Sequence, residues 1–309
     1  MKILLVGEIN LDIILQGYTT FPEPGRETLV QDFLMTLGSS CAITGTGLVR
    51  LGHSASYLGK TGDDPSGRFC LERMAALGLD VSMTKLVPEL KTGVTVAIAS
   101  REDRSLVSYL GATTVLRASD IPDETFAEFD HLHSSSFFLQ SGLHPGFEDL
   151  YRRAKQRGLS TSLDPACDPA DEWDSGLRGV LQYVDVFLPN EVELRGITGE
   201  ADPLAGIRAL ANGNTLTIAK LGPRGAMTEH DGEITCVSAP QVVPIDPTGA
   251  GDCFNAGFLH GWFTGRPMDE SLRLGVACGS YSTQALGGTG AQPTEEQALQ
   301  FLASHQGRN

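Results

Sequence analysis

The sequence predicts an α/β protein with a doubly wound, mostly parallel sheet that is flanked by helices. Three observations lead to this class. Short apolar runs alternate with amphipathic helical segments, the connections between them are short, and no internal repeat or long linker divides the 309 residues. Strands joined by helices through short connections form parallel crossovers. We therefore expect one domain over residues 1–309, with a substantial core.

Apolar runs without alternation are typical of strands that are buried on both faces. Such runs occupy residues 3–7, 131–135, 159–164, 184–189 and 215–222. Between them, apolar side chains with helical spacing predict helices over residues 65–78 and 147–158. The second of these ends at Gly158, a typical C-terminal stop.

Two segments break the alternation, residues 12–37 and residues 92–111. The first contains Pro22, Pro24 and Gly25, and the second alternates apolar and polar residues and turns at "REDR". We expect both to be extended and to form a small antiparallel sheet that stands off the main sheet as a lid. Such lids exclude water from reactive intermediates.

Composition excludes several function classes. The formal charge of −15 and the pI of about 4.8 disfavour binding to nucleic acid and to anionic membranes. The opening "MKILLVGEIN" has too short an apolar run for a signal peptide, and no later run approaches a membrane span. Six scattered cysteines without a C-x-x-C pair indicate neither a disulfide framework nor structural zinc. A cytoplasmic location is the expectation.

The stretch "DPTGAGDCFNAGF", residues 246–258, carries the chemistry. Phe254, Phe258 and Trp262 follow at helical spacing, which predicts a helix that starts near Ala250. The preceding turn therefore feeds a helix N-terminus, where free N–H groups and the helix dipole attract an anion. Asp252 then has two interpretations. It is either a capping acid or a general base that takes a proton from a substrate hydroxyl.

This stretch resembles the second signature of the ribokinase (pfkB) family of carbohydrate kinases. Further segments agree along nearly the whole chain: "GEINLD", "GKTGDDPSGRFCLERMAALGLD", "LPNEVEL", "KLGPRGA" and "GAQPT". The resemblance implies a ribokinase-like fold. It also implies transfer of the γ-phosphoryl group of ATP to a hydroxyl of a neutral sugar or sugar-like substrate.

By the same resemblance, Asp252 is the catalytic base, and Gly249, Ala250 and Gly251 form the anion hole. Phosphoryl transfer depends on positioning and charge neutralisation, so Mg²⁺ is expected with the nucleotide. Asn190 and Glu193 would act on that ion through water. Their alternative interpretation is a helix capping box, and both roles are compatible.

The resemblance also assigns nucleotide contacts. A buried ammonium needs a partner, so Lys220 is expected on a nucleotide phosphate, with a surface lysine as the alternative. Gly222 and Gly225 would let the nucleotide approach. The segment with Val276 and Gly279 is where the family packs the adenine.

Family members often bind K⁺ as well, and here the equivalent positions are Asp246, Thr248, Gly290 and Thr294. Their oxygens suit a hard cation. The alternative for Asp246 is a turn acid that accepts backbone N–H bonds. We therefore expect ATP and Mg²⁺ as cofactors, with K⁺ as an additional one.

The substrate end departs from the family pattern. Gly38 matches the first signature, whereas Ser39 and Ile43 replace a glycine and an asparagine. A substrate hydroxyl that faces Ile43 would lose its partner, which disfavours ribose and fructose. Asn10 and Asp12 remain hydroxyl contacts together with Gly38 and Ser39, and an arginine expected for acidic substrates is missing after Asp164.

Two alternatives stay open at this point. An apolar pocket at Ile43 would suit a nucleoside kinase, with Phe33, Phe137 and Phe138 as stacking faces. A protein that binds sugar or nucleotide without turnover is the rival from another class. The expected partners are a small sugar-like molecule and a second copy of the chain that covers the apolar lid, without nucleic acid or membrane.

Overall fold

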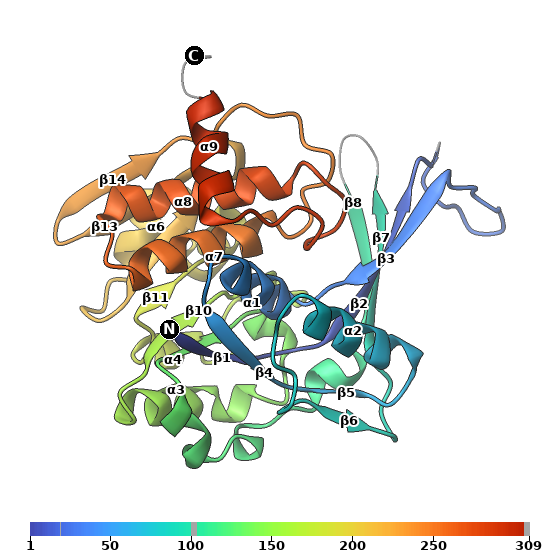
Figure 1. Cartoon of the computed structure of the whole chain (residues 1–309), viewed down its shortest axis with the longest axis horizontal. Coiled ribbons are helices and arrows are strands. Elements are labelled where there is room, and N and C mark those ends of the chain that lie inside the picture. Colours follow the sequence, from blue (N-terminus) through green and yellow to red (C-terminus); the bar gives the residue numbers. More distant parts are fainter. Residues whose placement is uncertain (19, 100–103, 306–309) are drawn as a thin grey trace.

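The main sheet has eight strands in the order β14-β13-β12-β11-β10-β9-β1-β4 (Figure 1). The computed structural model describes residues 1–18, 20–99 and 104–305. Neighbouring strands from β4 to β12 are parallel, and β13 and β14 form an antiparallel hairpin at one edge. The predicted fold class is therefore confirmed. The strands are β1 (Lys2–Val6), β4 (Ser54–Leu58), β9 (His131–Ser134), β10 (Ser160–Leu163), β11 (Val186–Phe187), β12 (Leu216–Lys220), β13 (Ala226–His230) and β14 (Glu233–Val237).

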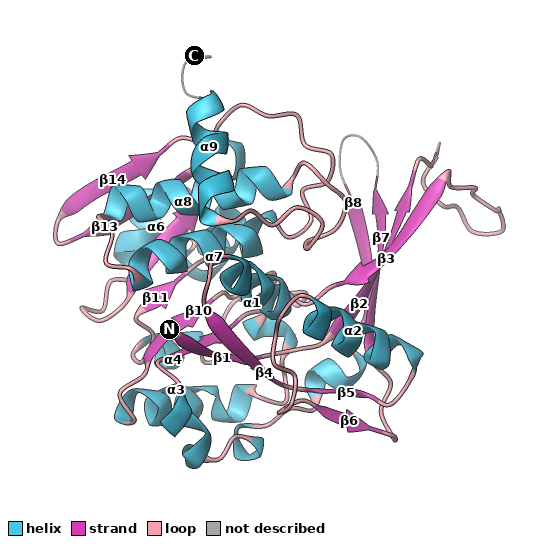
Figure 2. Ribbon diagram, viewed as in Figure 1, coloured by secondary structure: helices cyan, strands magenta, loops and turns pink. Residues whose placement is uncertain are grey.

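Helices cover both faces of this sheet (Figure 2). On one face, a single apolar cluster joins α1 (Ser40–Arg50), α2 (Pro65–Ala76), α7 (Ala250–Phe263), α8 (Met268–Ser282) and α9 (Glu295–His305). On the other, a second cluster joins α3 (Phe147–Gln156), α4 (Leu177–Leu181), α5 (Glu191–Thr198) and α6 (Pro203–Ala209). Successive residues of β1 enter the two clusters in turn, Ile3 on the first face and Leu4 on the second. This explains why the central strands are apolar throughout.

Short 3₁₀ turns link several elements: η1 (Gly111–Thr114), η2 (Ala118–Asp120), η3 (Asp123–Glu128), η4 (Phe137–Leu139), η5 (His144–Gly146) and η6 (Gly222–Arg224). A two-stranded parallel sheet pairs β5 (Lys60–Gly62) with β6 (Lys85–Val87). None of the helices within the described residues combines the length and apolar character needed to cross a bilayer.

A second sheet projects from the body in the order β3-β2-β7-β8 (Figure 1). Its strands are β2 (Asn10–Gln16), β3 (Asp32–Leu37), β7 (Gly93–Ala99) and β8 (Arg104–Tyr109). The expectation of a purely antiparallel sheet is wrong, because the central pair β2 and β7 is parallel. Between these two strands the chain passes through α1, β4 and α2, so it can return in the same direction. Residues 100–103, which include most of the expected "REDR" turn, lie outside the described residues.

The strand order reverses between β1 and β9. After β1 the chain reaches α1 on one face and then β4, whereas after β9 it continues to α3 on the opposite face and then β10. At such a switch point the two connections diverge and leave a crevice beyond the carboxyl ends of the strands, where α/β proteins bind ligands. The site is therefore expected at this edge.

Candidate active site

The glycine turn before α7 is shaped by its neighbours. Gly249 is the N-cap of α7 and has a φ of 75°, a left-handed conformation that favours glycine. A Cβ at Gly249 would lie only 2.5 Å from the Cα of Gly288. The helix begins at Ala250, as the spacing of its phenylalanines predicts. Its first amides thus open at a turn that has almost no side chains, which lets an anion approach the backbone.

Replacing Gly249 with alanine is expected to weaken folding and phosphoryl transfer together, because the new methyl group collides with backbone of the 288 loop. Gly265 offers a matched control, since its φ is 69° and no atom lies within 4 Å of its Cβ position. In both variants, alanine at a positive φ destabilises the folded state by about 1 kcal/mol. Only Gly249→Ala should lose more than this amount of unfolding free energy, as measured by urea unfolding. It should also lose most of its kcat. Equal losses in both variants would contradict the tight approach.

Asp252 lies in the first turn of α7 and keeps some solvent exposure, which a base needs to reach its substrate. Desolvation nevertheless raises its pKa well above the usual range, Asp164 raises it further, and Lys220 opposes the shift. A hydrogen bond from the Ser40 hydroxyl also lowers this pKa. The carboxyl is therefore held between one cation and several acids, a setting typical of acid–base groups.

Lys220, at the end of β12, supplies the positive charge that opposes the raised pKa of Asp252. Its Nζ lies 2.6 Å from Asp164 Oδ2 and 3.3 Å from Asn255 Oδ1. Asn255 also donates to Asp164 Oδ2 at 2.5 Å. Burial alone would lower the pKa of Lys220, but Asp164 and Glu193 raise it above its ordinary value. Protein carboxylates thus supply the counter-charge that a buried ammonium needs, and the expected contact of Lys220 with a nucleotide phosphate stays a prediction.

A cavity of about 240 Å³ lies beside this cluster. All five residues that the sequence assigned to the nucleotide line it: Lys220, Gly222, Gly225, Val276 and Gly279. Ala250 and Gly251 of the anion hole form part of the same wall. The remaining lining is largely apolar, with Pro240, Val242 and Phe254 among its members. The cavity therefore joins an apolar compartment, suited to a flat base, to a helix N-terminus that is suited to phosphate.

Asn190 and Glu193 form the capping box that the sequence offered as one interpretation. Asn190 Oδ1 accepts from the Glu193 amide at 2.9 Å, and Glu193 Oε2 accepts from the Asn190 amide at 2.7 Å. Glu193 Oε1 accepts from Asn190 Nδ2 at 2.6 Å. Burial raises the pKa of Glu193 to about 7, and Asp164 adds to the shift.

Each carboxylate oxygen of Glu193 accepts one of these bonds and retains a second lone pair, which suits a hydrogen bond from a metal-bound water. Within the described residues no group of three or more histidine, cysteine or acidic side chains could hold a metal ion. Mg²⁺ commonly keeps several waters and takes substrate phosphates as ligands. The donor set thus fits an ion that arrives with a nucleotide.

The four positions expected for K⁺ are brought together only in part. Asp246 accepts from the amides of Thr248 and Gly287, at 2.9 and 2.8 Å, so it joins the turn before α7 to the 287–290 loop. This is the turn-acid role that the sequence left open. Thr294 instead caps α9, where its hydroxyl accepts from the Gln297 amide at 3.3 Å.

At the substrate end, Asn10, Asp12 and Gly38 lie together. Asn10 Nδ2 donates to Asp12 Oδ1 at 2.8 Å and to Thr95 Oγ1 at 3.0 Å. A Cβ at Gly38 would approach Asp12 Oδ1 to 2.3 Å, so the loop closes onto this pair. The three residues belong to the junction between the main sheet and the projecting sheet.

Ser39 and Ile43 are held by contacts within the protein. Ser39 caps α1 at a φ of 68°, and its hydroxyl donates to the Glu8 carbonyl and accepts from the Ala42 amide. Ile43 is buried, and its side chain fills the space against Gly249 and Gly288. The serine hydroxyl is used by the helix end, and the isoleucine supports the anion-hole turn from behind. Their expected role as substrate contacts stays a prediction.

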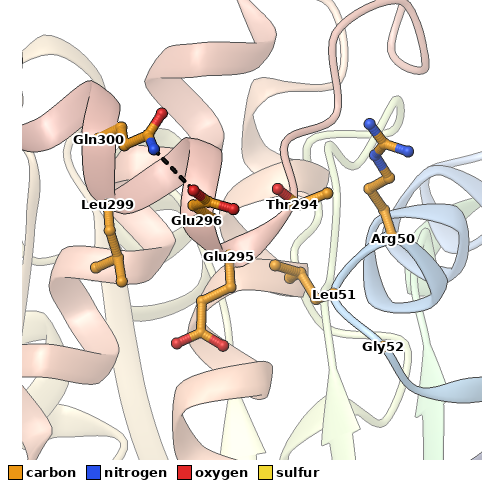
Figure 3. A pocket seen from close by; sticks show the side chains of 8 residues that line it. All are labelled: Arg50, Leu51, Gly52, Thr294, Glu295, Glu296, Leu299 and Gln300. Carbon is orange, nitrogen blue, oxygen red and sulfur yellow. Dashed lines mark hydrogen bonds between the residues drawn. The ribbon is translucent and has the colours of Figure 1, made fainter.

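A larger groove lies elsewhere. It measures about 660 Å³ and runs between the end of α1, with Arg50 and Leu51, and the first turns of α9, with Glu296 (Figure 3). It contains none of the anion-hole residues. Size alone therefore does not mark the site, whereas the convergence of charge and helix amides around Lys220 does.

Four residues of this region were missed as site residues by sequence reasoning: Glu8, Ser40, Asp164 and Asn255. Glu8 and Asp164 each follow a strand of the main sheet, and polar residues at carboxyl ends of parallel strands are the signal that could have found them. Asn255 lies one turn beyond Asp252 on α7, a spacing that places the two on one helix face.

Comparison with known proteins agrees with this geometry. Residues 1–295 match the model of the pfkB family carbohydrate kinases. The chain is 27% identical to a ribokinase of Haemophilus influenzae, covering 96% of this chain and 97% of that protein. It is 29% identical to a fructokinase of Klebsiella pneumoniae, covering 97% and 99%. The fold matches a crystal structure from E. coli, described as a ribokinase II with ATP and Mg²⁺, with a TM-score of 0.87, 22% identity and coverage of 98% and 99%. The chain belongs to the pfkB family of carbohydrate kinases.

Proposed function

We propose that the protein transfers the γ-phosphoryl group of ATP to a hydroxyl of a neutral sugar or sugar-like substrate. One observation carries this proposal: Lys220, Ala250 and Gly251 line the cavity of about 240 Å³, and Asp252 is the next residue of α7. The whole chain would act as one kinase domain. The projecting sheet, which holds Asn10 and Asp12 on β2, would act as its lid.

In this mechanism Asp252 takes the proton from the acceptor hydroxyl as its oxygen attacks the γ-phosphorus. The bond from that phosphorus to the β,γ-bridging oxygen breaks, ADP leaves, and the proton stays on Asp252 before release to solvent. The amides of Gly249, Ala250 and Gly251 would stabilise the charge on the transferring group. Because only the carboxylate form accepts a proton and its pKa is raised, activity should fall as the pH is lowered.

A bound Mg²⁺ supplies charge neutralisation to the phosphates. Asn190 and Glu193 would hold its water ligands. The side chains of both residues already bond to each other and to the backbone in the capping box. K⁺ would bind beside Asp246 and Thr248, close to the loop that Asp246 ties to the turn before α7. Its role would be to stiffen that turn. Thr294 is left out of this site because it caps α9.

For the substrate, Asn10, Asp12 and Gly38 offer polar contacts that suit a sugar better than an apolar group. The nucleoside alternative depends on stacking faces, and Phe137 and Phe138 are buried in the core of the opposite face. Phe33 on β3 remains exposed. A neutral sugar is therefore the better supported substrate, with a nucleoside as the second candidate.

The test is an ADP-release screen with Mg-ATP and K⁺ against sugars, sugar alcohols, sugar acids and nucleosides. Turnover with a neutral sugar is the expected result. Turnover confined to nucleosides would replace the substrate assignment, and binding of ATP and sugar without ADP release would identify a non-catalytic binding protein.

A homodimer through the lid is part of the proposal. Apolar side chains lie exposed on its outer strands, with 62% of Phe33, 55% of Leu106 and 63% of Val107 accessible. Exposed edge strands with apolar side chains tend to pair with the same strands of a second copy. We expect a dimer in sedimentation equilibrium and a monomer after Val107→Glu. Ile234→Glu, on the far edge strand β14, is the matched control and should stay dimeric. A parent protein that sediments as a monomer would contradict the dimer.

A further inference from the structure

A buried carboxyl without a complete set of partners lies at the switch point of the main sheet. Glu8 follows β1 and Ser136 follows β9, with exposed fractions of 4% and 3%. The Ser136 hydroxyl donates to Glu8 Oε1 at 2.9 Å. Glu8 Oε2 is buried and has no hydrogen-bond partner in the structure. Buried polar atoms are almost always paired, so this oxygen calls for a physical explanation.

A purely structural role accounts for only part of this arrangement. Backbone amides of Cys41 and Ser40, at the start of α1, lower the pKa of Glu8, as they would for an acid at a helix N-terminus. The helix is already capped by Ser39, however, and that cap uses the backbone carbonyl of Glu8. Tyr57 donates to the same carbonyl. The backbone at Glu8 is therefore held in place without its carboxyl, and Oε2 has no hydrogen-bond partner among the described residues.

The position of Glu8 relates it to the reacting centre. Ser40 lowers the pKa of both acids. Its backbone amide lowers that of Glu8, and its hydroxyl lowers that of Asp252. Glu8 also raises the pKa of Asp252 by charge repulsion. Both carboxyls are therefore close to the N-terminus of α1, and Glu8 follows β1 at the switch point of the sheet.

We propose that Glu8 is a substrate-binding residue whose Oε2 pairs with a second hydroxyl of the acceptor, next to the one that Asp252 activates. The inference rests on the proposed function and adds a specificity to it: the acceptor must carry at least two nearby hydroxyls. Ser136 holds the other oxygen and so orients the carboxyl. The carboxylate Oε2 would accept a hydrogen bond from that hydroxyl, a role that the NH2 group of glutamine cannot take.

The protonation of Glu8 supplies an independent readout. Burial raises its pKa from 4.5 to about 7. Among the described residues, the titratable groups on which Glu8 acts are Cys41 of α1, Tyr57 of β4 and Asp252 of α7, and none of these three is a cation. Because the folded state binds the proton more tightly, folding stability should fall as the pH rises from about 4.5 through 7. Glu8→Gln removes this loss, so it should be more stable than the parent at pH 8 and not at pH 4.5.

The test compares the parent with Glu8→Gln, which keeps an acceptor for Ser136. With the sugar that the screen identifies, the KM for sugar should rise about tenfold to hundredfold, while the KM for ATP stays within about twofold. Deoxy analogues of that sugar locate the hydroxyl. The analogue that lacks it should show the same KM with both proteins. Ser136→Ala is the second variant and should raise the KM for sugar by less.

The outcomes separate the two proposals. If Glu8→Gln alters neither KM, or alters those for sugar and ATP equally, Glu8 is an acid of the helix end and the inference fails although the kinase stands. If the parent shows no turnover, calorimetric titration of the same sugars into parent and Glu8→Gln replaces the KM. Weaker sugar binding by the variant then supports Glu8 while the kinase proposal fails. Absence of sugar binding to the parent overturns both.

Discussion

Asp252→Asn is expected to lower kcat by about 10² to 10⁴, the range that general-base catalysis contributes. Asparagine keeps the size of the side chain and the fold of α7 but cannot take the proton of the acceptor hydroxyl. The affinity for ATP should be unchanged or slightly higher, because a negative charge beside the anion hole is removed. Single-turnover kinetics and nucleotide titration measure the two effects.

The pH profile gives the same residue a second test. In the parent, kcat should decline toward acid pH as Asp252 is protonated, and this limb should vanish in the residual activity of Asp252→Asn. Asp246→Asn is the control, since Asp246 lies in the same segment and accepts backbone N–H bonds from Thr248 and Gly287, so the acid limb should remain in this variant. A variant at Asp252 that keeps full kcat would leave the residue as a helix-end acid.

Lys220→Met is expected to destabilise the protein by about 3–5 kcal/mol, the cost of leaving buried charge without its partner. In the structure this ammonium is the group that opposes the acids Asp164, Glu193 and Asp252. Methionine has a similar length and fills the volume, so the loss reports on charge rather than packing. Urea unfolding at pH 7.5 measures it.

The double variant Lys220→Met/Asp164→Asn is the first control. It removes both charges of the 2.6 Å pair and should recover much of the lost stability. Arg208→Met is the second, because Arg208 pairs with Glu229 at 2.8 Å on the surface and such pairs contribute little to stability. Losses of similar size in Lys220→Met and Arg208→Met would show that the buried cluster is not the electrostatic centre described above.

Much of the fold could be predicted because the core strands are apolar along their whole length. The runs around β1, β9, β10, β11 and β12 lie within a few residues of the strands in the structure. The strands β4, β13 and β14 were not predicted, since "SASYL" is short and half polar. The hairpin of β13 and β14 turns at Asp231 and Gly232, an Asp-Gly signal that could have located it.

His131 and His133 alternate along the buried strand β9, and both rings are satisfied within the core. Ser162 bonds to both rings, and burial lowers the pKa of each. They are polar links between β9 and β10 rather than ligands.

The sequence by itself determined what depends on neighbours along the chain. The glycine turn, the start of α7 at Ala250, the capping box of Asn190 and the acidic residue in the first turn follow from local spacing, because helix ends and turns are governed by a few consecutive residues. Only the tertiary structure decided what depends on distant segments. It placed Lys220 against Asp164 and Asn255, turned Ile43 behind the anion hole, and left one oxygen of Glu8 unpaired at the switch point. Charge partners in a buried site are chosen by proximity in space, and three strands and two helices must pack before that proximity exists.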